Sequence, residues 1–200
     1  MARPRSITDE AILATARRCF LERGAAVSAA EIAKELGVTH TTVFNRFRTK
    51  EALMVAALGP PEVLPWAAAV DAGPDGRPVR EQMEEIGRRI SDYFAHILPG
   101  LAMLNAAGLG PKETFRGRAE PTPVQAFRAL KGWLRRARRR GLIAPVDVDA
   151  LASTIIGALH SHAFNELLTG LPAPVSRADF TARFFELLWS GIAPHKEKHP

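Results

Sequence analysis

The sequence predicts an all-helical protein in which an N-terminal three-helix module, completed by a fourth helix, precedes a larger helical bundle. Strand signals are scarce, because the 200 residues include a single tyrosine and no long run of alternating apolar and polar residues. Apolar residues recur instead at helical spacing, between segments rich in glycine and proline. The length fits one small and one medium domain, which we place at 1–58 and 59–194, with a polar tail at 195–200.

Composition excludes several classes of protein. Cys19 is the single cysteine, so neither an intrachain disulfide nor a thiolate metal cluster can form. No apolar run reaches the roughly 18 to 20 residues that a membrane span needs, and the first residues do not resemble a signal peptide. We therefore expect a soluble, cytoplasmic protein without a membrane partner.

The charge of the chain indicates a polyanionic partner. The net charge is +6, and it is concentrated in two segments. Residues 1–50 contain nine basic and five acidic residues, and residues 128–140 contain seven basic residues and no acidic one. We interpret the second cluster as a solvated face and helix-end charge, because it lies just before Gly141, where cations stabilise a helix C-terminus.

A first helix is predicted to begin near Thr8 or Asp9 and to run to Gly24, with acidic residues in its first turn. One face of this helix would carry apolar residues, namely Ile12, Ala16, Cys19 and Phe20. Cys19 is therefore interpreted as a small core residue. A reactive thiol is the less favoured alternative, since the face offers it no basic neighbour.

The second helix has a predicted start and end. Ser28 and Glu31 match a capping box, in which the hydroxyl and the carboxylate satisfy each other's free backbone amides. Gly37 is expected to end the helix, because glycine adopts the left-handed conformation of a tight turn at little cost.

Two further short helices follow. Thr39 is a suitable N-cap for a third helix over 40–47, and Thr49 is a suitable N-cap for a fourth. The fourth helix would end at the Gly-Pro-Pro sequence of residues 59–61.

The rest of the chain is divided by proline and glycine. Residues 59–77 are predicted to be irregular, with one or two helical turns. The further helices are expected at about 78–98, 100–108, 121–140, 147–169 and 176–192. Pro99-Gly100 is taken to separate the first two of these, since proline lacks the amide hydrogen that a helix interior needs.

The second and third helices have the features of a DNA-reading unit. They are short, a turn with a glycine joins them, and the later one begins with small polar residues. Such a helix enters the major groove with its N-terminal end, so its first side chains meet base edges. Val43 and Phe47, four residues apart, would pack behind. A purely structural three-helix unit is the alternative.

The run from Glu31 to Leu53 closely resembles the N-terminal domain of TetR-family regulators, and the likeness covers about residues 7–58. The resemblance implies a dimeric transcriptional repressor that binds near-palindromic, double-stranded operator DNA and leaves it when a small effector binds. We expect no enzyme activity and no cofactor, because the sequence contains no catalytic or cofactor-binding motif. The expected DNA contacts are Ser28, Thr39, His40, Thr41, Thr42, Phe44, Asn45, Arg46 and Lys50.

Three features depart from the family pattern. Phe44 stands where the family often has tyrosine, so its ring offers only apolar contact, for example to a thymine methyl group. Arg46 stands where an aromatic residue is common and could contact a phosphate instead. The fourth helix is unusually short, which leaves open how effector binding reaches the DNA-reading helices. Lys50, by contrast, follows the family pattern, because it falls where the family usually contacts a phosphate.

The family resemblance also implies an apolar effector cavity among the later helices. Taken one by one, the large apolar residues of this region are more often core than pocket. The candidate lining residues are Trp66, Met83, Phe94, Met103, Phe127, Trp133 and Phe164.

The two C-terminal segments predict a homodimer. Residues 147–169 and 176–192 are apolar around most of the helix circumference, which is more than the chain's own core is expected to cover. We expect these helices to pair with their copies. The candidate interface residues are Ile155, Ala158, Leu159, Phe184 and Leu188.

No metal site and no catalytic motif is predicted. His160 and His162 are two residues apart and would point in different directions on a helix, so only His195 and His199 in the tail have ligand spacing. The alternatives within DNA binding are an activator or an effector-independent regulator. From another class, the chain could be a small-molecule carrier or a metal-binding helical protein that has kept the module.

Overall fold

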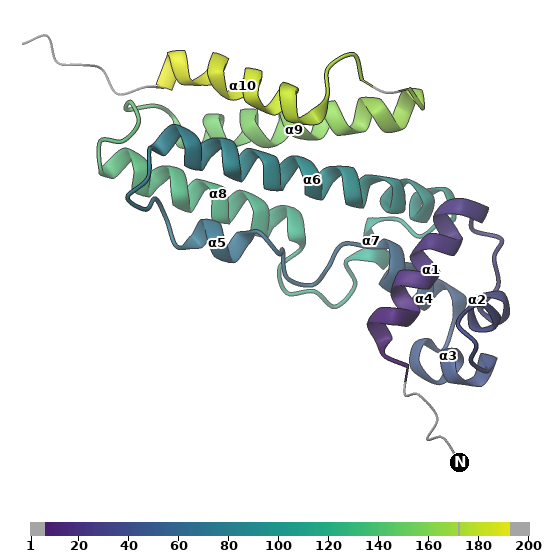
Figure 1. Ribbon diagram of the computed structural model, residues 1–200. Helices are drawn as coiled ribbons and strands as arrows, with labels where there is room; N and C mark the ends of the chain where they lie inside the picture. The colour runs from purple at the N-terminus through teal and green to yellow at the C-terminus, as the bar shows by residue number, and fades with distance from the viewer. Residues whose placement is uncertain (1–6, 172, 193–200) are drawn as a thin grey trace, which may run out of the picture. The chain divides into compact units, whose positions relative to one another are not determined.

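The computed structural model describes residues 7–171 and 173–192, and over these residues the protein is all-helical, as predicted (Figure 1). The helices in the described part are α1 (Asp9–Arg23), α2 (Ala29–Glu35), α3 (His40–Phe47), α4 (Lys50–Leu58), α5 (Ala67–Asp71), α6 (Val79–Ala106), α7 (Pro111–Thr114), α8 (Thr122–Arg139), α9 (Val148–Thr169) and α10 (Arg177–Ile192). None of them is long and apolar enough to cross a membrane.

The chain forms two compact units. The first unit comprises Met1–Pro60 and Pro99–Arg118, and the second comprises Pro61–Leu98 and Ala119–Pro200. Helix α6 therefore contributes its N-terminal part to the second unit and its last turns to the first.

Polar N-caps define the helices at the start of the first unit. The hydroxyl groups of Thr8, Ser28, Thr39 and Thr49 each accept a hydrogen bond from a backbone amide in the first turn of the helix that follows. These caps satisfy amides that have no partner within the helix. The predicted starts of α2, α3 and α4 are confirmed, and so is the capping box at the start of α2.

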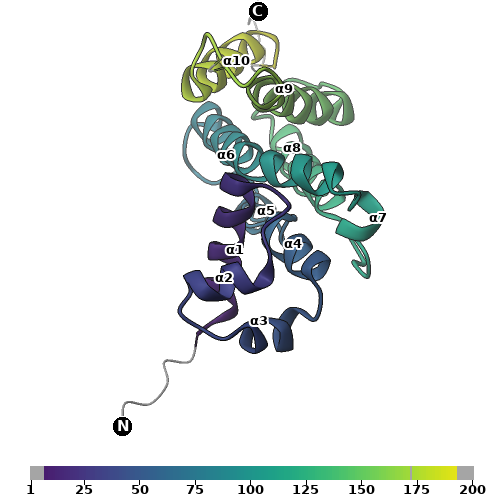
Figure 2. The ribbon, with the colours of Figure 1, turned by 90° about the vertical axis from the view of Figure 1, so that its right-hand side faces the viewer.

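The core of the first unit lies between α1 and α4 and extends to α2 and α3 (Figure 2). The predicted apolar face of α1 is completely buried, and Cys19 belongs to it. Leu104, from the last turns of α6, is buried in the same core. The sequence pattern gives no sign that residues 99–118 join the N-terminal helices in this way.

The predicted break at Pro99-Gly100 is wrong, because α6 continues through both residues. Proline in a helix interior costs about 3 kcal/mol, since it removes a hydrogen bond and crowds the preceding turn. Leu98 and Leu104 lie on either side of Pro99-Gly100. Both are buried, and the burial of each contributes roughly 1.5 to 3 kcal/mol to stability. Packing along the helix thus offsets the local penalty.

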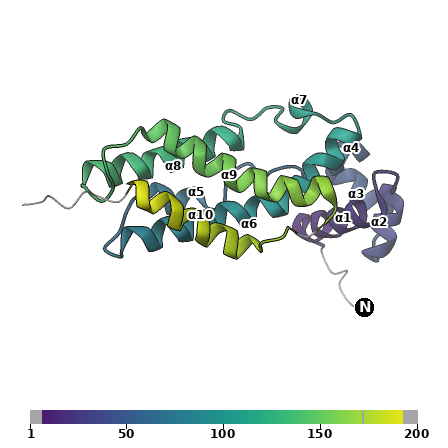
Figure 3. The same cartoon turned by 90° about the horizontal axis from the view of Figure 1, so that it is seen from above.

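The core of the second unit surrounds Trp133 of α8, one of the largest fully buried side chains. Helix α8 packs against α5 and α9, and α9 lies beside α10 (Figure 3). The ring of Phe185 in α10 lies against Gly87 of α6, where a methyl group would overlap it. The absence of a side chain at Gly87 therefore lets α10 approach α6 closely.

The basic end of α8 is only partly the solvated face that the sequence predicts. The Arg136 guanidinium donates to the backbone carbonyls of Val70 and Asp71, at 3.1 and 2.8 Å. Arg138 and Arg140 also donate to carbonyl groups of neighbouring loops. These arginines join α8 to the segments packed around it, a role that charge counting alone does not reveal.

Candidate nucleic-acid interface

Helices α2 and α3 are joined by a tight turn at Gly37. This residue has a φ of 69°, the left-handed conformation that glycine adopts most easily. The Val38 amide donates to the carbonyl of Ala33 at 3.0 Å, so the end of α2 is closed by its own backbone. The turn predicted between α2 and α3 is confirmed.

Helix α3 has one buried side and one exposed side. Val43 is buried and Phe47 packs against the core of the first unit, as predicted. His40, Thr41 and Asn45 are exposed on the other side.

Phe44 is an exposed aromatic residue on this side of α3. Its side chain is 47% exposed, and its ring centroid lies 6.0 Å from that of His40. The exposed ring therefore lies beside the polar residues at the start of α3.

Three of the predicted contact residues form hydrogen bonds at the starts of α2 and α3. The Thr39 and Thr42 hydroxyl groups lie 3.0 Å apart, and the Thr42 amide donates to Thr39 at 3.3 Å. The Ser28 hydroxyl donates to the Glu31 carboxylate at 2.7 Å. These hydroxyl groups hold the starts of α2 and α3 in place next to the exposed face.

A shallow hollow of about 400 Å³ connects α3 with the starts of α2 and α4. Four of the predicted contact residues line it together, namely Ser28, His40, Phe44 and Lys50. Arg48 also lines the hollow, and the prediction did not include it. The sequence could have indicated Arg48, because it is a basic residue directly before Thr49, the N-cap of α4.

Arg48 has an unusual backbone conformation. Its φ is 59° and its ψ is −46°, and among the described residues no other non-glycine residue has a positive φ. The Thr49 amide donates to the Phe47 carbonyl at 2.6 Å across it, which makes a tight three-residue turn. Non-glycine residues rarely adopt this region, and strain of this kind is concentrated at functional sites.

Lys50 is the first residue of α4 and is partly buried. It lies at the end of the helix where the backbone dipole is positive, so ammonium and helix together favour an anion. The Ser28 hydroxyl and then the Ser28 amide hold the pKa of Glu31 below its usual value, and Arg23 and Lys50 add smaller effects. Glu31 therefore stays ionised beside the hollow.

Arg46 pairs with a carboxylate of its own chain. Its guanidinium lies 2.8 Å from the Asp9 carboxylate, at the start of α1. A phosphate would have to compete with this partner, which the sequence interpretation of Arg46 did not foresee.

Glu35 joins the end of α2 to α1. Its carboxylate accepts hydrogen bonds from Arg23 at 2.8 Å, from the Cys19 thiol at 3.1 Å and from Arg18. The thiol hydrogen bond, followed by that from Arg18, lowers the pKa of Glu35. Burial raises the pKa of the Cys19 thiol, and Glu35 raises it further. The core interpretation of Cys19 is confirmed, although Arg23 is a basic neighbour that the sequence analysis missed.

The candidate effector residues lie in different surroundings. Trp66, Met83 and Trp133 belong to the core of the second unit, and Phe94 and Phe127 pack against it. The space between Met83, Trp133 and their neighbours admits no water-sized sphere. The structure does not bring the other two into this group, because Met103 packs on the core of the first unit and Phe164 is 41% exposed.

The candidate dimer residues also differ in how far they are buried. Ile155 and Leu159 face the core of their own chain and are completely covered, so a second copy could not contact them. Ala158, Phe184 and Leu188 are partly buried. The sequence could not distinguish the faces of α9, because an all-round apolar helix gives no sign of which side is inward.

The outer surface of α9 and α10 carries apolar residues that the prediction did not include. Leu168 in α9 is 70% exposed and Leu187 in α10 is 75% exposed.

No group of three or more histidine, cysteine or acidic residues suited to a metal occurs within residues 7–171 and 173–192. The His160 ring lies between those of Phe94 and Phe164, with centroids at 5.1 and 5.8 Å. The His162 ring packs on Phe180 at 4.2 Å. His195 and His199 lie outside the described residues.

Comparison with known proteins agrees with this geometry. Residues 12–57 match the family described as bacterial regulatory proteins, tetR family. No curated protein matches the chain.

Solved structures resemble the chain over almost its whole length. A TetR transcriptional regulator from Streptomyces coelicolor is 26% identical, with a TM-score of 0.58 over 92% of this chain and 98% of that one. A TetR-family regulator from Pseudomonas syringae is 23% identical, with a TM-score of 0.60 over 94% and 99% of the two chains. A third structure, described as the molecular basis for control of antibiotic production by bacterial hormones, is 24% identical, with a TM-score of 0.63 over 94% and 100%.

Proposed function

Because the chain is a DNA-binding transcriptional regulator of the TetR family, we propose that it acts as a repressor in the bacterial cytoplasm, where the chromosome lies. In this proposal a homodimer binds a near-palindromic operator, and a small effector releases it. The observation that carries the proposal is the exposed face of α3, bordered by Lys50 and Arg48.

The start of α3 would enter the major groove. His40 and Thr41 are exposed there and would meet base edges, with Asn45 on the flank. The Phe44 ring would contact a thymine methyl group. Lys50, and Arg48 on the neighbouring turn, would bind phosphates on the same strand, which fixes the helix in the groove without reading sequence.

The outer face of α9 and α10 would form the two-fold interface. Leu168 and Leu187 are exposed there, and Gly157 on α9 would allow close approach of a second copy. A two-fold dimer presents two reading helices to half-sites about 34 Å apart, or a multiple of one DNA turn. The operator would share that symmetry.

Helix α6 offers a route for effector release that does not depend on the short α4. Its residues up to Leu98 belong to the second unit and its residues from Pro99 to the first. Gly100 of α6 packs against the Leu58 carbonyl at the end of α4. A shift of α6 would therefore displace the end of α4. Coupling between effector and DNA is typically about 1 to 3 kcal/mol.

Footprinting on the DNA upstream of the protein's own gene tests this function. Wild-type protein should protect two half-sites. Replacing Lys50 with alanine should weaken binding to all DNA sequences about equally and reduce the salt slope by about one unit, as one lost phosphate contact requires. His40→Ala should instead relax base preference by about 1 to 3 kcal/mol at defined positions.

Three results would contradict the proposal. Absence of any protected site would favour a carrier or metal-binding protein that has kept the module. If Lys50→Ala changed the base preference and left the salt slope unchanged, Lys50 would not be a phosphate contact. Lower transcription of the adjoining genes after deletion of the regulator would make it an activator.

A further inference from the structure

We propose that the second unit binds a small zwitterionic molecule of the amino-acid type in a cleft between α6 and the start of α10, and that this molecule is the effector. Only the effector role rests on the function proposed above. Binding in the cleft is a property of the second unit and is testable without DNA.

The described core around Met83 and Trp133 has no room for an effector. The side chains around Met83 and Trp133 fill the space between α6, α8 and α10, and no water-sized sphere fits among them. An apolar effector would have to open this core, at the cost of contacts that stabilise it. A cleft at its edge requires no such opening.

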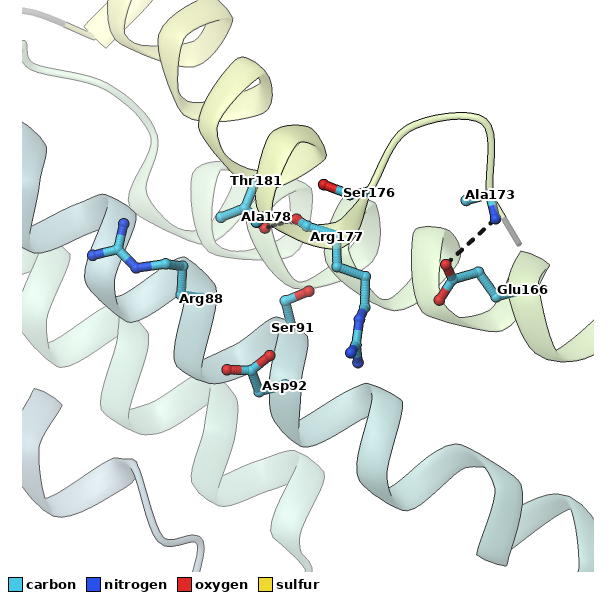
Figure 4. Close-up of a pocket in the computed structure, with 9 residues that line it drawn as sticks. All are labelled: Arg88, Ser91, Asp92, Glu166, Ala173, Ser176, Arg177, Ala178 and Thr181. Atoms are coloured by element: carbon cyan, nitrogen blue, oxygen red, sulfur yellow. Dashed lines mark hydrogen bonds between the residues drawn. The ribbon is translucent and has the colours of Figure 1, made fainter. Parts of the chain in front are cut away.

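The cleft has a volume of about 590 Å³, within the range of small-molecule sites (Figure 4). Helix α6 forms one wall with Arg88, Ser91 and Asp92. The first turns of α10, including Arg177, form the opposite wall, and Glu166 near the end of α9 lies at one side.

The cleft contains charges of both signs that are not paired with each other. Most arginines of the second unit form ion pairs or donate to backbone carbonyls. Arg88 and Arg177 do neither, as is also true of Arg139 and Arg183 outside the cleft, and no carboxylate of a described residue lies within 4.0 Å of the Arg88 or Arg177 guanidinium. Asp92 likewise has no basic group of a described residue within that distance.

Two buried hydroxyl-bearing residues lie between the charged walls. Thr181 is buried and donates to the Arg177 carbonyl at 2.8 Å, which leaves this hydroxyl committed to α10. Ser91 is only 3% exposed and lines the cleft next to Asp92. Figure 4 shows its hydroxyl group directed from α6 toward α10. A polar molecule in the cleft would find this hydroxyl available as a hydrogen-bond donor and acceptor.

The arrangement of charge selects the class of molecule. Figure 4 shows the Arg177 guanidinium and the Asp92 carboxylate extending from opposite walls into the same part of the cleft. A carboxylate bound by Arg177 and an ammonium bound by Asp92 would satisfy both groups at once, and such bonds between ionised groups are stronger than neutral ones. A simple anion would leave Asp92 unneutralised beside it, and a simple cation would do the same to Arg177.

Binding would act on α6 directly. Arg88, Ser91 and Asp92 occupy the helix about two to three turns before Pro99, where the chain passes into the first unit. Proline removes one helix hydrogen bond at this point, so the helix is less resistant to bending there. A molecule that draws α10 toward α6 would therefore shift the turns that carry Gly100.

The test uses the full-length protein and the twenty free amino acids, added one at a time and followed by thermal unfolding and calorimetric titration. At least one should raise the unfolding midpoint, by roughly 5 °C at a hundredfold excess over its Kd. The N-acetylated and the amidated forms of that amino acid each lack one charge and should bind at least tenfold more weakly.

Variants assign the binding to the cleft. Asp92→Asn and Arg177→Gln should each weaken binding at least tenfold, and Arg177→Lys should recover part of it. Arg183→Gln is the matched control, because Arg183 is also an arginine of α10 but is exposed and does not line the cleft. Circular dichroism of the variants confirms that they are folded.

Several outcomes would overturn the inference. The cleft would not be a zwitterion site if no amino acid bound, if Asp92→Asn and Arg177→Gln bound like the control, or if succinate bound as tightly as the best amino acid. An amino acid that binds in the cleft but leaves DNA affinity unchanged would remove the effector role alone. Failure to bind any operator would contradict the proposed function and leave the binding measurement valid.

Discussion

The two compact units are held together in different ways. The first unit uses short helices whose ends are fixed by Thr8, Ser28, Thr39 and Thr49, with Glu35 joining α2 to α1. The second unit uses long helices around the large buried side chain of Trp133. Local hydrogen bonds thus specify the starts of the short helices in the first unit, whereas packing of large side chains specifies the bundle of the second unit. The first arrangement leaves one face of α3 exposed, and this is the face proposed to bind DNA.

The largest effect is expected in the packed unit. Trp133→Ala should destabilise the protein by about 3 to 5 kcal/mol, because it removes a fully buried aromatic ring and leaves a cavity. Urea unfolding measures the change. Val124→Ala is the control on the same helix, since Val124 is exposed and should change stability by less than about 0.5 kcal/mol. Equal effects of the two substitutions would show that this core does not hold the second unit.

The next effect concerns the close packing of α6 with α4. Gly100→Ala should cost about 1 to 3 kcal/mol, because the new methyl group would overlap the Leu58 carbonyl oxygen. Gly132→Ala is the matched control in α8, where the nearest atom is 3.5 Å away on the Arg136 side chain. There the substitution should stabilise by about 0.5 to 1 kcal/mol, as alanine does in a helix interior. A stabilising Gly100→Ala would mean that α6 and α4 do not pack as described.

A smaller effect is expected at the helix ends of the first unit. Ser28→Ala should cost about 1 kcal/mol, because it leaves the Glu31 amide without its cap and breaks the capping box. Ser153→Ala on the exposed side of α9 should have a much smaller effect, since that hydroxyl donates within its own helix. Chemical denaturation compares the two, and equal losses would argue against capping as the stabilising feature of α2.

The same contrast explains what the sequence could predict. The starts of α2 to α4 and the turn at Gly37 were predictable, because a cap or a glycine acts on its immediate neighbours. The continuation of α6 through Pro99 was not, since it depends on tertiary packing. The inward side of Ile155 could not be assigned within an all-apolar helix. Likewise, the pairing of Arg46 with Asp9 depends on a contact between residues distant in sequence.

The smallest expected effect is a pH dependence in the first unit. Hydrogen bonds from the Cys19 thiol and then from Arg18 lower the pKa of Glu35 in the folded protein relative to its ordinary value of 4.5. The carboxylate therefore binds its proton less readily when the protein is folded than when it is unfolded. Its contribution to stability is fully present above about pH 4.5 and is lost as the pH falls through the lower, folded pKa.

Glu35→Gln should accordingly be slightly less stable than the wild type at pH 7, and this difference should shrink as the pH falls below 4.5. The effect should be modest, because the side chain is partly exposed and water screens its ion pairs. Urea midpoints of both proteins between pH 7 and pH 3 measure it, and the neutral-pH difference is the internal reference. A difference that stayed constant over this range would show that the carboxylate charge does not join α2 to α1.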